Sequence, residues 1–158
     1  MHSDLVVALA VGIGFVAGLR SLTAPAAISW AACVGWLDLH GSPLAFMGSR
    51  VAVVIFSLLA ILEYVADQLP STPRRTTPGP LVARIVTGGL SGACLCASAG
   101  RSLALGGALG GLGGVIGAFA GYEARTRLVK ALKVKDRVIA LSEDLVAIAL
   151  AWLFVAGR

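Results

Sequence analysis

Acidic residues interrupt two stretches of this sequence that are otherwise apolar. Glu63 and Asp67 stand four residues apart near the end of one stretch, and the adjacent Glu143 and Asp144 lie inside another. A carboxylate alone in bilayer hydrocarbon costs roughly 2.5 to 3.5 kcal/mol on insertion scales, so such residues usually face a partner or a water-filled path. On a helix, Glu63 and Asp67 share one face. The chemistry available to these groups is cation binding or proton carriage.

Two arginines are candidates for a binding site, Arg84 beside the carboxylates and Arg20 apart from them. Arg84 lies just inside another apolar stretch, and we expect it to pair with one or more of the acidic groups. Arg20 precedes Pro25, near the outer end of the first stretch. Two uses of Arg20 stay open: it binds an anion together with free helix amides, or its side chain reaches the outer head groups. Glu123 and Arg125 are expected at the edge of the site.

The composition indicates the elements that must position these residues. The chain has 158 residues, of which 58% are hydrophobic and 13% charged, and its mean hydropathy is +0.90. Apolar runs of about 20 residues without alternation predict membrane-spanning helices, since lipid cannot satisfy backbone polar groups. We expect one integral membrane domain over residues 1–158, an all-α polytopic bundle. Its five predicted spans are Leu5–Ala24, Phe46–Leu69, Leu81–Ala99, Leu103–Tyr122 and Val138–Ala156.

A shorter apolar segment leaves the number of spans open. Ala26–Leu37 is bounded by Pro25 and by a polar stretch that ends at Pro43. Its length suits a re-entrant or interfacial helix. If this segment crosses instead, the chain has six spans, and its two ends lie on the same side of the membrane.

The net charge of +5 is unevenly distributed, which bears on orientation rather than on nucleic acid, and we expect no nucleic-acid partner. The positive-inside rule places segments 70–80 and 123–137 in the cytoplasm. With five spans, the start of the chain shares that side and its end lies outside. Basic segments beside a membrane also suit anionic lipid head groups. The residues concerned are Arg74, Arg75, Arg125, Arg127, Lys130, Lys133, Lys135 and Arg137.

Glycines recur at intervals of three and four residues in the fourth stretch. Such ridges allow helix backbones to approach closely where no hydrophobic drive acts between helices. The contact is expected either within the chain or between two copies in a homodimer. The residues expected at it are Gly106, Gly110, Gly114, Gly117 and Gly121.

A weak internal repeat links the first and fourth stretches. In the five-span arrangement these helices run in opposite directions, which suits the inverted repeats found in many transporters. The pattern Gly14, Ala17, Gly18 and Thr23 recurs at Gly117, Ala120, Gly121 and Thr126.

Little in the sequence indicates catalysis. His2 and His40 are the two histidines of the chain, and both are expected near membrane surfaces, so a Ser-His or Cys-His arrangement has little support. Cys33, Cys94 and Cys96 lie in apolar sequence without companion ligands. We therefore expect no enzyme, no cofactor and no bound metal.

Three motifs in order carry a resemblance to a known family. They are Gly18–Pro25, Glu63–Pro70 and Ser142–Asp144, and they resemble the bacterial membrane proteins grouped as domain of unknown function 4126. The resemblance implies a small polytopic protein of the bacterial cytoplasmic membrane, and it supplies no activity.

Two functions compete on these observations. The first is a transporter or channel for a small solute or ion, in which the carboxylates bind a cation or carry protons. The alternative is a non-enzymatic protein that organises lipid or partners, in which the buried charges form an ion-pair network that fixes helix registry.

Overall fold

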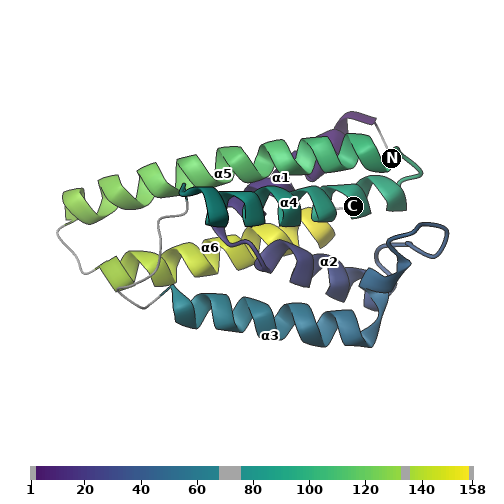
Figure 1. Ribbon diagram of the computed structural model, residues 1–158, viewed down its shortest axis with the longest axis horizontal. Coiled ribbons are helices and arrows are strands. Elements are labelled where there is room, and N and C mark those ends of the chain that lie inside the picture. The colour runs from purple at the N-terminus through teal and green to yellow at the C-terminus, as the bar shows by residue number, and fades with distance from the viewer. Residues whose placement is uncertain (1–2, 68–75, 133–135, 157–158) are drawn as a thin grey trace.

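The chain folds into a bundle of helices. A computed structural model describes residues 3–67, 76–132 and 136–156, and those ranges contain no strand (Figure 1). The predicted all-α class is confirmed. The elements are α1 (Ser3–Leu19), α2 (Thr23–Cys33), the short 3-10 helix η1 (Ala45–Gly48), α3 (Arg50–Ala66), α4 (Pro78–Ser98), α5 (Leu103–Leu132) and α6 (Asp136–Ala156).

Local sequence signals place several of the helix ends. The Ser49 hydroxyl accepts a hydrogen bond from the Ala52 amide at 3.1 Å and caps the start of α3. Pro78 and Pro80 occupy the first turn of α4, where a missing amide hydrogen costs nothing. Pro25 stands in the first turn of α2 for the same reason.

Three helical stretches in the described part of the chain are long and apolar enough to cross a membrane: Pro78–Ser98, Leu103–Ala131 and Val138–Ala156. The segment Asp4–Leu19 is apolar but shorter. α2 has 11 residues and extends about 16 Å, roughly half of a hydrocarbon core. Many large apolar side chains on the outer faces of the bundle are exposed, as suits helices that face lipid. These features support a membrane location.

The predicted first span is wrong as a continuous helix. α1 ends at Leu19, the chain unwinds over Arg20–Leu22, and α2 begins at Thr23 and runs back along the bundle. The short predicted helix therefore starts three residues earlier than Ala26. Apolar composition continues across this break, so composition did not reveal it.

α1, α4 and α5 form the closely packed part of the bundle, and glycines make the close approach possible. An added Cβ atom on Gly88 would lie 2.6 Å from the Gly110 carbonyl oxygen, and one on Gly92 would lie 2.9 Å from the Gly110 Cα atom. Gly14 and Gly18 of α1 also lie against α5, at Gly110 and Gly117. Backbone meets backbone along these lines, where larger side chains would hold the helices apart.

The glycine contacts also show the helix directions. Gly14 lies beside Gly110 and Gly18 beside Gly114, so α1 and α5 run parallel. Gly88 faces Gly110 and Gly92 faces Gly106, so α4 runs antiparallel to α5. The two copies of the glycine pattern therefore lie on parallel neighbouring helices, and the inverted repeat predicted from them is wrong.

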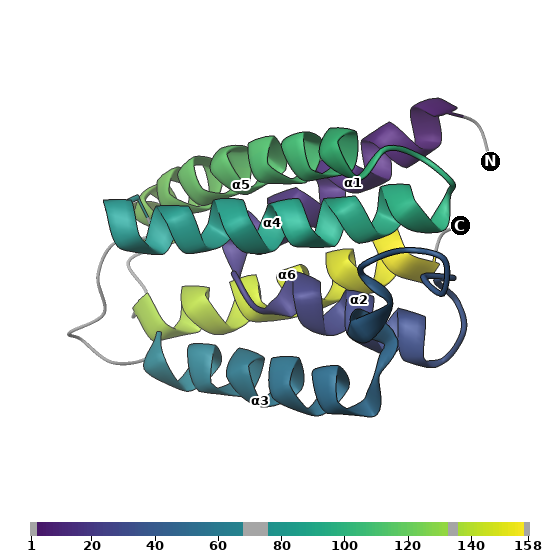
Figure 2. The ribbon, with the colours of Figure 1, turned by 45° about the vertical axis from the view of Figure 1, so that its right-hand side comes forward.

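The first and the last helix share one end of the bundle. α1 starts and α6 finishes at the end where α4 turns into α5, while α5 finishes and α6 starts at the opposite end (Figures 1 and 2). We call the latter the basic end, because Arg127 and Lys130 lie there. The five-span prediction placed the start of the chain on the same side of the membrane as these residues. That placement is wrong, because the chain reverses at Arg20–Leu22 and α1 starts at the opposite end of the bundle. Arg74, Arg75, Lys133 and Lys135 lie outside the described residues.

α3 lies at one side of the bundle, beside α2 (Figure 2). It runs antiparallel to α2, since Trp30 donates a hydrogen bond to Ser57 at 3.0 Å and Thr23 contacts Tyr64 nearer the other end. The outward face of α3 is apolar and exposed, for example at Val51 and Leu58. α3 is therefore held to the remaining helices mainly along one face, and that face carries the acidic residues.

Candidate functional site

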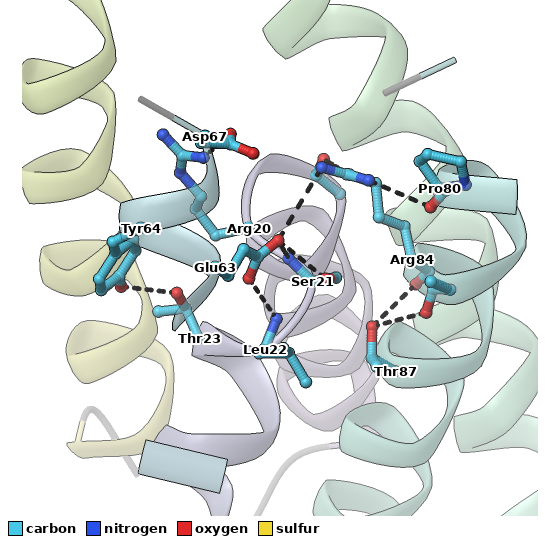
Figure 3. Close-up of polar contacts among 12 residues, drawn as sticks. Arg20, Ser21, Leu22, Thr23, Glu63, Tyr64, Asp67, Pro80, Arg84 and Thr87 are labelled. Carbon is cyan, nitrogen blue, oxygen red and sulfur yellow. Dashed lines mark hydrogen bonds and ion pairs between the residues drawn. The ribbon is translucent and has the colours of Figure 1, made fainter. Parts of the chain in front are cut away.

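The unwound segment between α1 and α2 is the centre of the polar site. With no helical partners, the amides of Ser21 and Leu22 need other acceptors. The Glu63 carboxylate supplies them, and it accepts hydrogen bonds from the Ser21 amide, the Ser21 hydroxyl and the Leu22 amide, each at 2.8 Å (Figure 3). The Glu63 carboxylate, which comes from α3, thus lies at the amino end of α2, where amides and the helix dipole favour negative charge.

Arg20 is fully buried, with 0% of its surface exposed. Its guanidinium forms ion pairs with Asp67 and, at 2.5 Å, with Asp144, and it lies 5.8 Å from the centre of the Tyr64 ring. The Nε atom has no hydrogen-bond partner within the described ranges. A buried arginine of this kind requires its carboxylates, because the desolvation of one unpaired charge costs several kcal/mol.

Neither use proposed for Arg20 matches this geometry. The side chain is enclosed by helices rather than directed to head groups, and the amides beside it hold the protein's own Glu63. The predicted separation of Arg20 from the carboxylates is also wrong. Because α1 ends at Leu19 and the chain turns back, the bundle brings Arg20 level with the carboxyl end of α3 and the third turn of α6.

Arg84 adjoins the same site from α4. Its Nε atom donates to the Gly18 carbonyl at 3.0 Å and its Nη1 atom to the Pro80 carbonyl at 3.1 Å, while Nη2 lies 3.9 Å from Glu63 (Figure 3). The predicted pairing with a carboxylate therefore exists at the long limit of an ion pair, and backbone carbonyls provide the shorter contacts. The hydrogen bond to Gly18 ties α4 to the carboxyl end of α1.

Tyr64 is a member of the cluster that the sequence did not single out. Its hydroxyl lies 2.7 Å from the Thr23 hydroxyl, in the first turn of α2. The signal available was its place between Glu63 and Asp67, but one aromatic residue in an apolar stretch more often belongs to a core. Ser29 lies further along α2 and is fully buried, and its hydroxyl has no hydrogen-bond partner within the described ranges.

The residues predicted at the edge of the site lie apart from the cluster. Glu123 pairs with Arg127 at 2.7 Å on an exposed helix surface. Arg125 and Glu143 line a cavity of about 310 Å³ between α5 and α6. Glu143 thus points to a different space from its neighbour Asp144.

The predicted packing glycines lie at contacts inside the chain. Gly106, Gly110 and Gly114 approach the backbone of α4, and Gly117 approaches α1 at Phe15. Gly121 is buried and lines the cavity between α5 and α6. These surfaces of α5 are therefore used within one chain.

Within the described ranges, no group of three or more histidine, cysteine, aspartate or glutamate side chains could hold a metal ion. The described carboxylates of the cluster face guanidinium groups and backbone amides instead. What the arrangement offers chemically is a set of buried charges whose balance changes when a proton or an ion is bound.

Comparison with known proteins agrees with the motifs around Arg20, Glu63 and Asp144. The searches of curated proteins and of solved structures returned no match. The model of the family described as domain of unknown function 4126 matches residues 7–156, nearly the whole chain, so this protein belongs to that family.

Proposed function

We propose that this protein transports protons, or a small ion or solute together with protons, across a membrane, with the cluster of Arg20, Glu63, Asp67 and Asp144 as its site. The observation that carries the proposal is the unwound segment inside the bundle at which a fully buried arginine meets carboxylates from α3 and α6. Discontinuous helices with ionisable residues at the break are a common way to build transport sites. Buried charges in spanning helices are costly and usually functional.

The contacts of Glu63 suggest how the site responds to a proton. An ionised carboxylate accepts the three hydrogen bonds from Ser21 and Leu22, whereas a protonated one loses part of that capacity and its attraction to Arg84. Glu63, Tyr64 and Asp67 fasten the end of α3 to the unwound segment. Proton binding at Glu63 would therefore loosen α3 from α1 and α2, and re-ionisation would restore the contact.

A second function is favoured by the same hydrogen bonds. Glu63 has three donors, and Arg84 has two backbone acceptors. These hydrogen bonds, together with the ion pair between Arg20 and Asp144, also serve to fix α1, α3, α4 and α6 against one another. On this alternative the protein is a non-enzymatic organiser of lipid or of partner proteins, and the charges maintain its shape.

Flux measurements in liposomes separate the two functions. Purified protein is reconstituted, and proton and cation flux are measured under imposed gradients for the wild type, Glu63→Gln and Asp144→Asn. Glu123→Gln is the matched control, because Glu123 is exposed and pairs with Arg127 at the surface. Transport predicts flux in the wild type and the control, and flux at the level of empty liposomes in the two site variants while they remain folded.

The opposite result is equally informative. Wild-type protein without flux across a panel of cations and small solutes, together with lower thermal stability of both site variants, would support the structural network. Equal flux in Glu63→Gln and the wild type would remove Glu63 from any transport mechanism.

We also infer an orientation in the bilayer. The basic end, with Arg127 and Lys130, faces the cytoplasm of a bacterial cell, and the protein lies in the cytoplasmic membrane. The start of α1 and the end of α6 then face outside. The three tryptophans support a membrane surface at the end of the bundle away from the basic end. Trp30, Trp36 and Trp152 lie in that part of the bundle and are about half exposed, as in an interfacial aromatic belt.

A further inference from the structure

A groove between α5 and α6 is unused by the proposed function. It is a cavity of about 310 Å³ with a floor formed by Phe15 and Leu19 of α1. On the α5 wall, Gly121 and Ala124 are small and create the hollow, and Val146 lines the α6 wall. Most of the lining is apolar, so water would gain few hydrogen bonds inside it.

The groove opens to the outside of the bundle. Ala124, Leu128 and Val146 line it and are also exposed, Leu128 to 44% and Val146 to 52%. Since α5 and α6 are both long and apolar enough to cross a membrane, the surroundings of this opening are lipid chains. A hydrocarbon chain that enters from the side would bury these apolar walls and leave no polar backbone unsatisfied.

One end of the groove carries positive charge. Arg125 lines it, and Arg127 and Lys130 follow on the same helix. The 30 residues of α5 extend about 45 Å, longer than the roughly 30 Å hydrocarbon core, so its last turns reach the head-group region. Segment 123–137 contains six basic and two acidic residues, which attracts anionic lipids. Glu143 on the facing wall is the acidic group that the head group must avoid.

We propose that this groove is a binding site for an anionic phospholipid of the surrounding bilayer. One acyl chain lies between α5 and α6 over Phe15 and Leu19, and the phosphate is bound by Arg125, whose long side chain reaches toward the head groups. Such a lipid would also cover the side of α6 that carries Glu143, beside the charge cluster. The site is independent of whether the protein transports anything.

Native mass spectrometry of the full-length protein tests the acyl chain position. Delipidated protein in detergent is titrated with dioleoylphosphatidylglycerol or with zwitterionic dioleoylphosphatidylcholine. We expect one phosphatidylglycerol bound in clear preference to phosphatidylcholine. Ala124→Leu fills the groove and should weaken that binding about tenfold, because contact with about two methylene groups is lost. Ala108→Leu is the control, since Ala108 is exposed on α5 and does not line the groove.

A second pair of variants tests the head group. Arg125→Gln should weaken phosphatidylglycerol binding about fivefold and leave phosphatidylcholine binding unchanged. Arg127→Gln removes the same charge from the same helix outside the groove and should have a much smaller effect. Arg125 is partly exposed, so we expect its replacement to leave the fold intact, and this comparison decides the matter even if Ala124→Leu unfolds. Equal effects of the two arginine variants, or no lipid preference in the wild type, would overturn the proposal.

Discussion

At the scale of single residues, the main feature is that opposite charges from distant parts of the sequence neutralise one another inside the bundle. Arg20 comes from the end of α1, Asp67 from the end of α3 and Asp144 from α6. Burying any one of these charges alone in a low-dielectric interior would be costly. The three form a network, and removal of any single member is unfavourable because it takes a partner from the charges that remain. The cluster therefore couples the positions of three helices.

Replacement of Arg20 should be strongly destabilising. Arg20→Gln removes a buried counter-charge from Asp67 and Asp144, and we expect the free energy of unfolding to fall by about 3–5 kcal/mol. Thermal or denaturant unfolding in detergent micelles measures the change. The matched control is Arg127→Gln, whose side chain is 78% exposed and whose effect should stay within about 0.5 kcal/mol. If the two variants unfolded alike, the cluster would not stabilise the bundle.

At the scale of helices, close backbone contact decides the arrangement of α1, α4 and α5. α5 is apolar and glycine-rich on more than one face, and this allows one helix to pack against two neighbours. The parallel pair of α1 and α5 requires the chain to return along the bundle between them. The break at Arg20–Leu22 starts that return.

The glycine contact between α4 and α5 can be tested with one methyl group. An added Cβ atom on Gly110 would come within 3.0 Å of the Gly92 Cα atom and closer still to Gly88, where only backbone could move away. Gly110→Ala should therefore lower the free energy of unfolding by about 1–3 kcal/mol. Gly107→Ala serves as the control, because the nearest atom to its added Cβ is 3.9 Å away, and it should be neutral or slightly stabilising. A neutral Gly110→Ala would contradict the close packing.

At the scale of the whole molecule, the ends of the bundle differ in chemistry. The basic end carries Arg127 and Lys130, whereas the opposite end carries exposed tryptophans such as Trp36 and Trp152. An excess of basic residues is the expected mark of a cytoplasmic surface, whereas exposed tryptophans are expected at either membrane interface. The difference between the ends also makes the orientation testable without knowledge of the transported species.

Labelling of single cysteines in cells should show the two ends on opposite sides. In a variant with Cys33, Cys94 and Cys96 replaced by alanine, we expect Gly41→Cys to react with a membrane-impermeant maleimide added outside. Lys130→Cys should react only after the membrane is opened. Reaction of both positions from the same side would exclude the orientation inferred here.

The sequence by itself indicated a membrane environment and several of the residues that meet in the charge cluster. Apolar runs and scarce charges require helices in a bilayer, because lipid cannot hydrogen-bond to the backbone. Carboxylates inside such runs are costly enough to stand out, so Glu63, Asp67 and Asp144 were found from their positions. These inferences depend on local composition, which is visible along the chain.

Only the tertiary structure decided which charge meets which. Arg20 and Asp144 are 124 positions apart, and a continuous first helix would have carried Arg20 away from α3 and α6. The short break after Leu19 reverses the chain, makes α1 and α5 parallel, and turns the amides of Ser21 and Leu22 toward Glu63. The break lies within apolar sequence, so its position depends on helix packing and on ion pairs between distant residues. A local sequence pattern cannot predict either of these.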